Sequence, residues 1–360
     1  MARQASLGTP KPGLISLADP ALNQESPPHA LGHPITPTAL FFVRNNGTLP
    51  EVAPEDWRLE VTGRVHRPLV LRLEELRARF PVVELTAVLE CAGNGRSGFA
   101  PPVPGLAWGP GAVGCARWTG VRLADVLAAA GVVEDAVYVA HESPDHVIGA
   151  PGRLALSRGL PLAKAMAQET LLAFAMNGAP LDPLHGFPLR VVAPGYPGSA
   201  WQKWLSRIVV RDCEHDGAKM TGLDYRLPRR PVAPGEAPDP AIFDVITDMP
   251  VKSLITAPAE GFSATGPLTI SGFAWSGAIP VTRVALSADG GATWQEAPLE
   301  PGEGRWAWRG FEARLALPPG EVELIARATD AAGNTQPMEP PWNPRGYCNN
   351  AVHRIRGRIG

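Results

Sequence analysis

Apolar and polar residues alternate along several short stretches of the first 230 residues, a pattern typical of half-buried strands. Strands are predicted at WRLEVTG (57–63), at the more apolar VVELTAVL (82–89), and at 137–140, 189–193 and 208–211. Helices are predicted at 73–79, 121–130 and 162–167. Gly131 follows the second helix and is a plausible stop for it, because glycine tolerates the left-handed conformation that ends many helices.

The pattern changes near residue 227. The segment PRRPVAPGEAPDP is dense in proline and is typical of an interdomain linker. Beyond it only strands are predicted, at 268–275, 281–287, 294–299, 306–315 and 322–328. Asp289, Gly290 and Gly291 form a hairpin-turn signal. Short strands at this spacing predict a sandwich of immunoglobulin type.

Composition restricts the class of protein. The chain has 360 residues, 45% of them hydrophobic and 19% charged, which is an ordinary globular composition. A formal net charge of −2 argues against a nucleic-acid partner. No apolar run is long enough to predict a membrane span. The first twenty residues lack the apolar core of a secretory signal, so a cytoplasmic location is expected, or a periplasmic one if a leader was removed.

A cysteine follows the apolar strand at 82–89, in the segment ECAGNGRSG. Gly93, Gly95 and Gly98 let backbone N–H groups approach a ligand closely, and Arg96 adds a cation that favours the thiolate. Cys91 is therefore a candidate nucleophile or metal ligand. Taken alone, it is also compatible with a small buried core residue, the more frequent role of a free cysteine.

Three further segments concentrate polar and cationic residues. They are FFVRNNG (41–47), DPLHGFPLR (182–190) with KWLSR (203–207), and WNPRGYCNNAVHR (342–354). Arginine suits the bidentate binding of oxyanions, so the first segment is a candidate grip for an anion or a polar cofactor. His185, Arg190 and Lys203 of the second could bind a phosphate together, and the third has an unusual density of Asn, Arg, His and Trp. The alternatives are a surface arginine, a structural loop histidine and a loop that caps the sandwich.

Taken in order, these segments resemble the sulfite oxidase family of molybdenum enzymes. FVRNNG is similar to the family's F-x-R-N-H segment, and ECAGNGRS to its C-A-G-N-R-R-S signature. ARWTGVRLADVL, AMNGAPL, HGFPLR and KWLSRIVV resemble further family blocks. AWSG, SADGGATW and WNPRGYCNNAVHR resemble its C-terminal dimerisation domain. The resemblance runs from Phe41 to Ile355.

The resemblance implies a mixed α+β molybdopterin-binding core followed by an all-β immunoglobulin-like sandwich. The expected division is an N-terminal arm that wraps or frays (1–40), a catalytic domain (41–230), a linker (231–250) and a dimerisation domain (251–360). The expected cofactor is molybdenum–molybdopterin. A homodimer is expected as well.

The resemblance also implies roles for individual residues. Cys91 would be the thiolate ligand of molybdenum, and a soft anionic sulfur suits that metal. Residues expected to contact the cofactor are Phe42, Val43, Arg44, Asn45, Asn46, His185, Arg190, Trp201, Gln202 and Lys203, with either Ser143 or Asp145 touching the pterin. The expected substrate pocket contains Arg44, Arg96, Tyr225 and Arg345, whose charges and hydroxyl suit an oxyanion.

The activity implied is oxidation of sulfite to sulfate by oxygen-atom transfer, with electrons passed to an external acceptor such as a cytochrome c. Three positions depart from the family pattern: Asn46 replaces a histidine, Gly95 replaces an arginine, and Ala200 stands where many members have an arginine. These departures reduce the positive charge near the pocket. Two alternatives therefore stay open, namely the same cofactor acting on nitrate or an S- or N-oxide, and a molybdopterin-binding protein without turnover.

Overall fold

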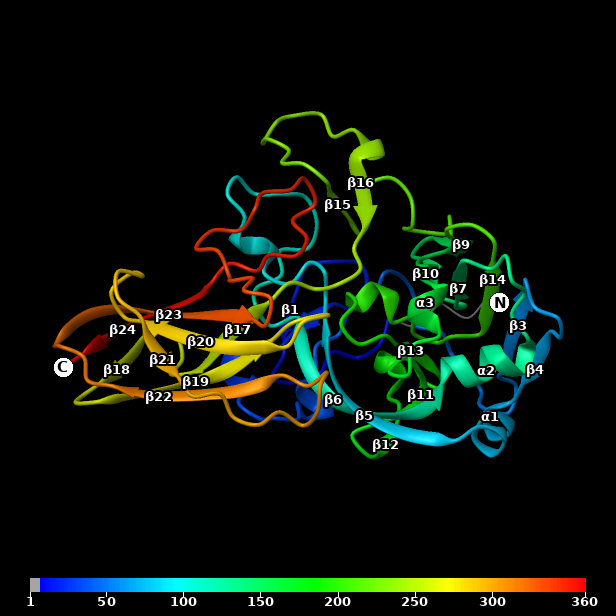
Figure 1. The fold of residues 1–360 in the computed structure, drawn as a ribbon, viewed down its shortest axis with the longest axis horizontal. Helices are drawn as coiled ribbons and strands as arrows, with labels where there is room; N and C mark the ends of the chain where they lie inside the picture. The colour runs from blue at the N-terminus through cyan, green and yellow to red at the C-terminus, as the bar shows by residue number, and fades with distance from the viewer. Residues whose placement is uncertain (1–6) are drawn as a thin grey trace.

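The computed structural model describes residues 7–360, so the first six residues of the predicted arm lie outside it. The chain is mostly β-structure with three short α-helices among the described residues. Figure 1 shows two parts side by side: the N-terminal part, which contains all three helices, and an elongated C-terminal part built of strands. No helix within residues 7–360 is long and apolar enough to span a membrane.

Two sheets form the N-terminal part. The first has the order β10-β7-β14-β3-β4. Its strands are β3 (Leu59–Gly63), β4 (Leu69–Leu71), β7 (Tyr138–Glu142), β10 (Arg158–Pro161) and β14 (Arg207–Arg211). The second has the order β12-β11-β6-β5, with β13 also paired to β11. Its strands are β5 (Val82–Glu90), β6 (Val113–Arg122), β11 (Leu171–Met176), β12 (Ala179–Pro180) and β13 (Arg190–Val192).

Helices α1 (Leu73–Arg79), α2 (Leu123–Ala130) and α3 (Leu162–Ala165) contribute to the same core. Helix α2 buries Leu123, Val126, Leu127 and Ala130, the spacing of one helical face. It ends at Gly131, which has φ +71° and donates its N–H to the Leu127 carbonyl at 3.0 Å. The prediction that this helix begins at residue 121 is wrong, because Val121 and Arg122 pair with β11 as the end of β6.

The N-terminal arm wraps onto the rest of the molecule over the described residues. Strand β1 (Ile15–Ser16) pairs with β2 (Gln24–Glu25), and Gln24 in turn bridges to Val43. The Glu25 carboxylate accepts N–H groups from Gly109 (3.0 Å) and Gly111 (3.3 Å). The small hairpin of β8 (His146–Val147) and β9 (Ala150–Leu154) lies apart from both sheets of the N-terminal part.

Two sheets pack face to face in the C-terminal part. One has the order β17-β19-β22 and the other β18-β24-β23-β20-β21. The strands are β17 (Lys252–Ala257), β18 (Phe262–Ala264), β19 (Leu268–Trp275), β20 (Val281–Ser287), β21 (Gln295–Ala297), β22 (Arg309–Leu315), β23 (Gly320–Asp330) and β24 (His353–Ile359). Their shared core includes Ile255 and Phe311 from the first sheet and Leu286 and Leu324 from the second.

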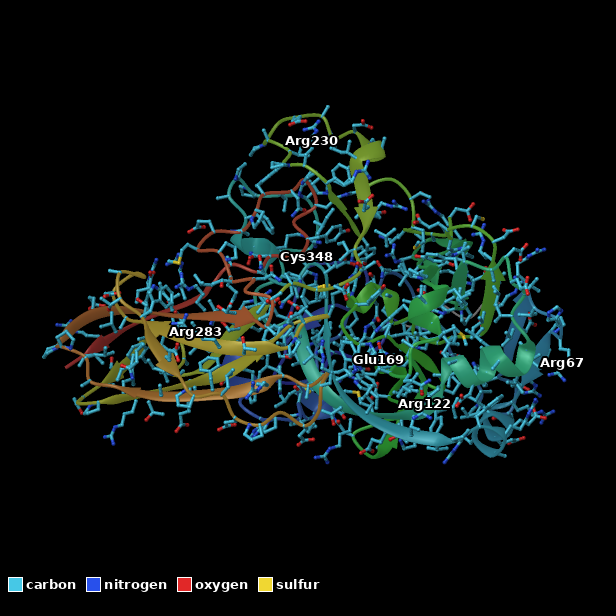
Figure 2. All side chains as sticks on the ribbon, viewed as in Figure 1. Arg67, Arg122, Glu169, Arg230, Arg283 and Cys348 are labelled. Carbon is cyan, nitrogen blue, oxygen red and sulfur yellow. The ribbon has the colours of Figure 1, made fainter. Side chains whose placement is uncertain are left out.

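The segment between the two parts contains regular structure of its own. Strand β15 (Arg226–Pro228) pairs with β16 (Phe243–Val245), and the loop joining them projects at the top of Figure 1. The segment 342–354 does not simply close the sandwich. Cys348 lies at the junction of the two parts (Figure 2), where its N–H donates to the Ala92 carbonyl at 2.8 Å.

Candidate active site

Cys91 lies at the point where β5 ends and a tight loop begins. Its N–H donates to the Ala112 carbonyl at 2.9 Å, which extends the β5–β6 ladder by one bond. The Cys91 sulfur accepts only a long contact, 3.4 Å, from the N–H of Gly93. Gly95 has φ +82°, a conformation that L-residues rarely adopt, so the loop itself favours glycine at this departure from the family pattern.

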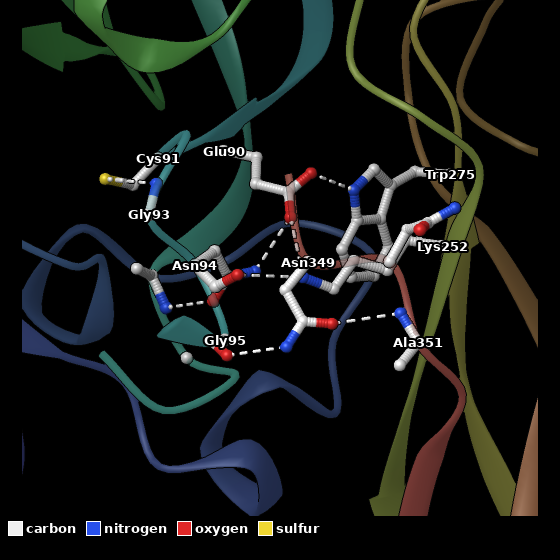
Figure 3. A network of polar contacts seen from close by, with 12 residues as sticks. Glu90, Cys91, Gly93, Asn94, Gly95, Lys252, Trp275, Asn349 and Ala351 are labelled. Carbon is white, nitrogen blue, oxygen red and sulfur yellow. Dashed lines mark hydrogen bonds and ion pairs between the residues drawn. The ribbon is translucent and has the colours of Figure 1, made fainter. Parts of the chain in front are cut away.

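A buried polar network holds this loop from the C-terminal part (Figure 3). The Glu90 carboxylate accepts hydrogen bonds from Asn94 Nδ2 (2.8 Å), Lys252 Nζ (3.0 Å) and Trp275 Nε1 (2.7 Å). Asn349 Nδ2 donates to the Gly95 carbonyl at 2.7 Å. Strands β17 and β19 and the C-terminal segment therefore fix the residues on both sides of Cys91.

Cys91 faces a pocket with about 650 Å³ of space free of protein atoms, counting the space at its opening. Most of the predicted site residues line it: Phe42, Arg44, Asn45, Asn46, Cys91, Asp145, His185, Arg190, Trp201, Gln202, Lys203 and Tyr225. The other lining residues, which the sequence did not single out, are Leu89, Leu156, Leu184, Gly198, Ser199 and Trp204. Segments far apart in sequence thus converge on one cavity.

Four predicted residues lie outside this lining. Val43 is buried, and its backbone exchanges two hydrogen bonds with Gln24. Ser143 lies behind Asp145, to whose carboxylate it donates at 2.5 Å. Arg96 instead donates to the carbonyls of Leu106 and Arg345.

Arg345 is the fourth. Its guanidinium pairs with Asp224 at 3.1 Å and is about 39% exposed. Of the four residues expected to form the substrate pocket, only Arg44 and Tyr225 therefore line this cavity.

Asn46 connects these two residues. Its side-chain oxygen accepts a hydrogen bond from Arg44 Nη2 at 2.7 Å and a longer one from the Tyr225 hydroxyl at 3.5 Å. An amide oxygen has two lone pairs and accepts both donors at once, whereas a neutral histidine nitrogen accepts only one. Asn46, which stands where the family has a histidine, thus orients both the Arg44 guanidinium and the Tyr225 hydroxyl.

The pocket is rich in cations. Arg44, Arg190 and Lys203 line it, beside His185, against the single carboxylate of Asp145. Burial, followed by the charge of Arg190, holds the pKa of Lys203 well below its usual value. Burial likewise lowers the pKa of Arg190 and raises that of Asp145. The cavity therefore favours an anionic ligand, which would relieve this repulsion between like charges.

Two buried polar atoms in the lining have no hydrogen-bond partner within the part of the chain that the structure describes, Asn45 Nδ2 and Ser199 Oγ. Buried polar groups are almost always satisfied, so both atoms point to a ligand with matching polar groups. Together with the sulfur and the cations, they fit a metal cofactor that carries a polar ring and an anionic tail. No cluster of three or more His, Cys, Asp or Glu side chains occurs among residues 7–360, so a lone thiolate is the protein ligand that this pocket offers.

Sequence reasoning missed Lys11, Arg158 and Tyr347. Lys11 comes from the N-terminal arm, and its ammonium contacts His185 Nε2 at 2.5 Å. The Arg158 guanidinium lies over the Tyr225 ring at 5.1 Å, and Tyr347 stacks on that ring with centroids 5.3 Å apart. Only Tyr347 had a signal, because it lies in the conspicuous segment WNPRGYCNNAVHR.

Comparison with known proteins agrees with this geometry. Residues 46–219 match the family described as "Oxidoreductase molybdopterin binding domain", and residues 243–359 match the "Mo-co oxidoreductase dimerisation domain". The cofactor of the pocket is accordingly molybdenum–molybdopterin.

Relatives of known activity cover most of the chain. It is 41% identical to human mitochondrial sulfite oxidase over 92% of this chain and 63% of that protein. It is 39% identical to chicken sulfite oxidase over 95% and 77%, respectively. It thus spans less than two thirds of the mammalian relatives' length. The barley nitrate reductase is 36% identical over 96% of this chain and 42% of that protein.

A solved structure shares the fold. The sulfane dehydrogenase SoxCD from Paracoccus pantotrophus superposes with a TM-score of 0.79 at 31% identity, over 94% of this chain and 85% of that chain. The family matches in both halves of the chain, the shared fold and the cysteine pocket all indicate the same family. The chain belongs to the sulfite oxidase family of molybdopterin-dependent oxidoreductases.

Proposed function

We propose that the protein oxidises sulfite to sulfate at a molybdenum–molybdopterin cofactor held by Cys91. The observation that carries this proposal is the position of the Cys91 sulfur in one cationic pocket with Arg44 and Tyr225. The net reaction converts sulfite and water into sulfate, two protons and two electrons. When bound, the cofactor supplies the two-electron oxygen-atom transfer chemistry.

The chain's own residues bind and orient the cofactor and the substrate. The Cys91 thiolate would be the protein ligand to the metal. Arg190 and Lys203, whose cations lie in the lining, would hold the anionic tail of the cofactor. Arg190 is itself fixed, because it donates to the carbonyls of His185 (2.9 Å) and Trp201 (3.1 Å). Phe42 adds an apolar wall that limits the access of water.

Arg44 and Tyr225 would grip the oxygens of sulfite. Arg44 is anchored by Asn23 at 3.2 Å as well as by Asn46, so its guanidinium is pre-oriented. The Tyr225 hydroxyl lies 3.5 Å from the same Asn46 oxygen, and its single proton would turn from this long contact to a sulfite oxygen. Preorganised donors of this kind stabilise the negative charge of the substrate better than water does.

We propose further that the C-terminal part, residues 251–360, is an immunoglobulin-like dimerisation domain following a mixed α+β catalytic domain. The packed sheets β17-β19-β22 and β18-β24-β23-β20-β21 support this assignment. Electrons would leave to an external acceptor, for which a cytochrome c is our proposal.

A substrate comparison tests the proposed function. Molybdenum-loaded protein is assayed with sulfite using ferricyanide or cytochrome c as acceptor, and with nitrate or dimethyl sulfoxide using reduced viologen. We expect kcat/KM to be highest for sulfite. Faster turnover of nitrate would overturn the substrate assignment and favour the activity of the plant relatives.

The Cys91→Ser variant is the matched control. We expect it to remain folded by circular dichroism, to lose nearly all turnover and to contain little molybdenum, because a hydroxyl is a poor ligand for this metal. Near-native turnover in this variant would remove Cys91 from its proposed role.

A further inference from the structure

Arg158 is a fully buried cation next to the pocket. It begins strand β10, and its side chain is 0% exposed. Its Nη1 donates to the Lys219 carbonyl at 2.6 Å, while its Nε has no hydrogen-bond partner. Buried charges are normally paired, but among residues 7–360 no carboxylate lies within ion-pair distance of its guanidinium. Glu214 and Asp244 line the same hollow as Arg158, where they pair with Arg226 and Arg229, respectively.

The guanidinium of Arg158 lies 5.1 Å from the centroid of the Tyr225 ring. Tyr225 in turn stacks on Tyr347, with centroids 5.3 Å apart and planes inclined by 18°. Arg96 lies over the Tyr347 ring at 5.2 Å. Two arginines and two stacked tyrosines therefore form one cluster, and the hydroxyl of Tyr225 reaches from that cluster toward Asn46 in the pocket.

Arg158 also shapes the segment that carries Tyr225. Lys219 and Tyr225 have φ +66° and φ +53°, left-handed conformations that are unfavourable for non-glycine residues. Arg158 contacts the first through its carbonyl and the second through its ring. One side chain thus holds both constrained ends of this short segment.

A cation buried without a counter-ion is costly, and the face of a tyrosine ring compensates only part of that cost. Burial lowers the pKa of Arg158 accordingly. An anion bound at the Tyr225 hydroxyl would bring a negative charge to the ring that the Arg158 guanidinium contacts. The same positive charge makes the hydroxyl a stronger hydrogen-bond donor.

We propose that Arg158 is a positioning residue for the oxyanion substrate, which acts through Tyr225 by orienting its ring and strengthening its hydrogen bond to a substrate oxygen. This inference rests on the proposed function. It adds a buried cation beside Tyr225 to the half-buried cation that Arg44 provides in the lining, and it gives the unpaired guanidinium a role.

Sulfate binding to the holoenzyme provides a test that does not depend on turnover. The chain has only four tyrosines, so ¹³Cζ-tyrosine labelling gives four resonances, and Tyr225 is assigned with Tyr225→Phe. We expect sulfate to shift the Tyr225 signal of the wild type. In Arg158→Met we expect the sulfate Kd and the sulfite KM to rise about tenfold, with a smaller change in kcat.

Three variants separate charge from structure. Arg158→Lys keeps the charge and should recover most of the affinity. Arg158→Gln keeps a donor for the Lys219 carbonyl but removes the charge, so it should match Arg158→Met, and it decides the matter if the methionine variant is unfolded. Arg226→Met is the control, because Arg226 lines the same hollow as Arg158 but is paired with Glu214.

The outcomes are distinct. A folded neutral variant with a sulfate Kd within twofold of the wild type would overturn the role of Arg158 and leave the proposed function intact. A wild-type holoenzyme that neither binds sulfate nor oxidises sulfite would overturn both. An equal loss of affinity in Arg226→Met would mean that the effect is general damage to the hollow.

Discussion

Lys11 shows how a residue of the N-terminal arm reaches the site. The Gln24 side chain clamps its backbone, accepting its N–H at 2.8 Å and donating to its carbonyl at 3.1 Å. The Lys11 ammonium donates to the Thr38 carbonyl at 2.5 Å and contacts His185 Nε2. Burial together with the charges of Lys11 and Lys203 keeps the pKa of His185 low. The imidazole is therefore neutral, and its Nε2 accepts a hydrogen bond from the Lys11 ammonium.

Replacing Lys11 should therefore weaken the hold on the cofactor through His185, the residue of the pocket lining that Lys11 contacts. A charge-assisted hydrogen bond contributes about 1.5–3 kcal/mol, so we expect Lys11→Met to lose molybdenum about tenfold faster on dialysis at pH 7. Burial lowers the pKa of Lys11 to about 8, against the opposing charge of Asp182. Because an anion favours the protonated amine, cofactor retention should fall as the pH rises through 8.

Lys11→Arg is the matched control for this prediction, because a guanidinium stays charged at pH 9. Molybdenum content after dialysis at pH 7 and pH 9 is the measurement. Equal retention by the wild type and Lys11→Met at both values would show that the ammonium has no part in holding the cofactor.

At the residue scale, the sequence predicted those positions that lie in recognisable segments. Cys91, Arg44, His185 and Lys203 all reach the pocket lining. Arg158 and Lys11 were not predicted, because neither lies in a distinctive segment and each acquires its role only from a contact across more than sixty residues.

At the scale of elements, the end of β5 is bound to the start of β17. Glu90 and Lys252 form an ion pair at 3.0 Å whose side chains are 3% and 7% exposed, respectively. Lys252 also donates to the Asn94 carbonyl at 3.3 Å, and Trp275 of β19 completes the cluster (Figure 3). The residue that precedes Cys91 is thus fixed by two strands of the other half of the chain.

Breaking this pair should destabilise the protein strongly. Lys252→Met leaves the Glu90 carboxylate buried without its cation, which costs about 3–5 kcal/mol of unfolding free energy. The double variant Glu90→Gln, Lys252→Met should recover most of that loss, because no unpaired charge remains. Urea unfolding followed by circular dichroism measures both, and loss of molybdenum reports on the Cys91 loop.

An exposed pair provides the control. Arg283 and Glu296 are 2.6 Å apart with side chains 53% and 69% exposed, so Arg283→Met should cost less than about 1 kcal/mol. If Lys252→Met cost no more than this, the proposed coupling of β5 to β17 would be refuted.

The strands and helices were predicted best where the pattern of apolar and polar residues within the element itself is distinctive. Helix α1 and strands β5, β19 and β20 lie close to their predicted ranges. Strands β17 and β24 were missed, as was β11, which is apolar throughout (LLAFAM) and shows no alternation. Their positions depend on partners elsewhere in the sheets, which short-range patterns do not reveal.

At the scale of the whole molecule, the two halves share one site. The pocket lining comes from residues between 42 and 225, while Lys252, Trp275 and Asn349 support the Cys91 loop from the C-terminal half. The C-terminal sandwich is therefore part of the catalytic framework in addition to its proposed role as a dimerisation domain. Both contributions come from the same chain.

This arrangement makes the proposed dimer separable from catalysis. Light scattering coupled to size exclusion should give twice the chain mass of 38.2 kDa at micromolar concentration. Because the described residues of one chain supply the pocket lining and its support, the turnover per chain should stay constant within twofold when dilution dissociates the dimer. A monomer at every concentration would refute the dimer, whereas activity that falls with the dimer fraction would mean that the partner chain completes the pocket.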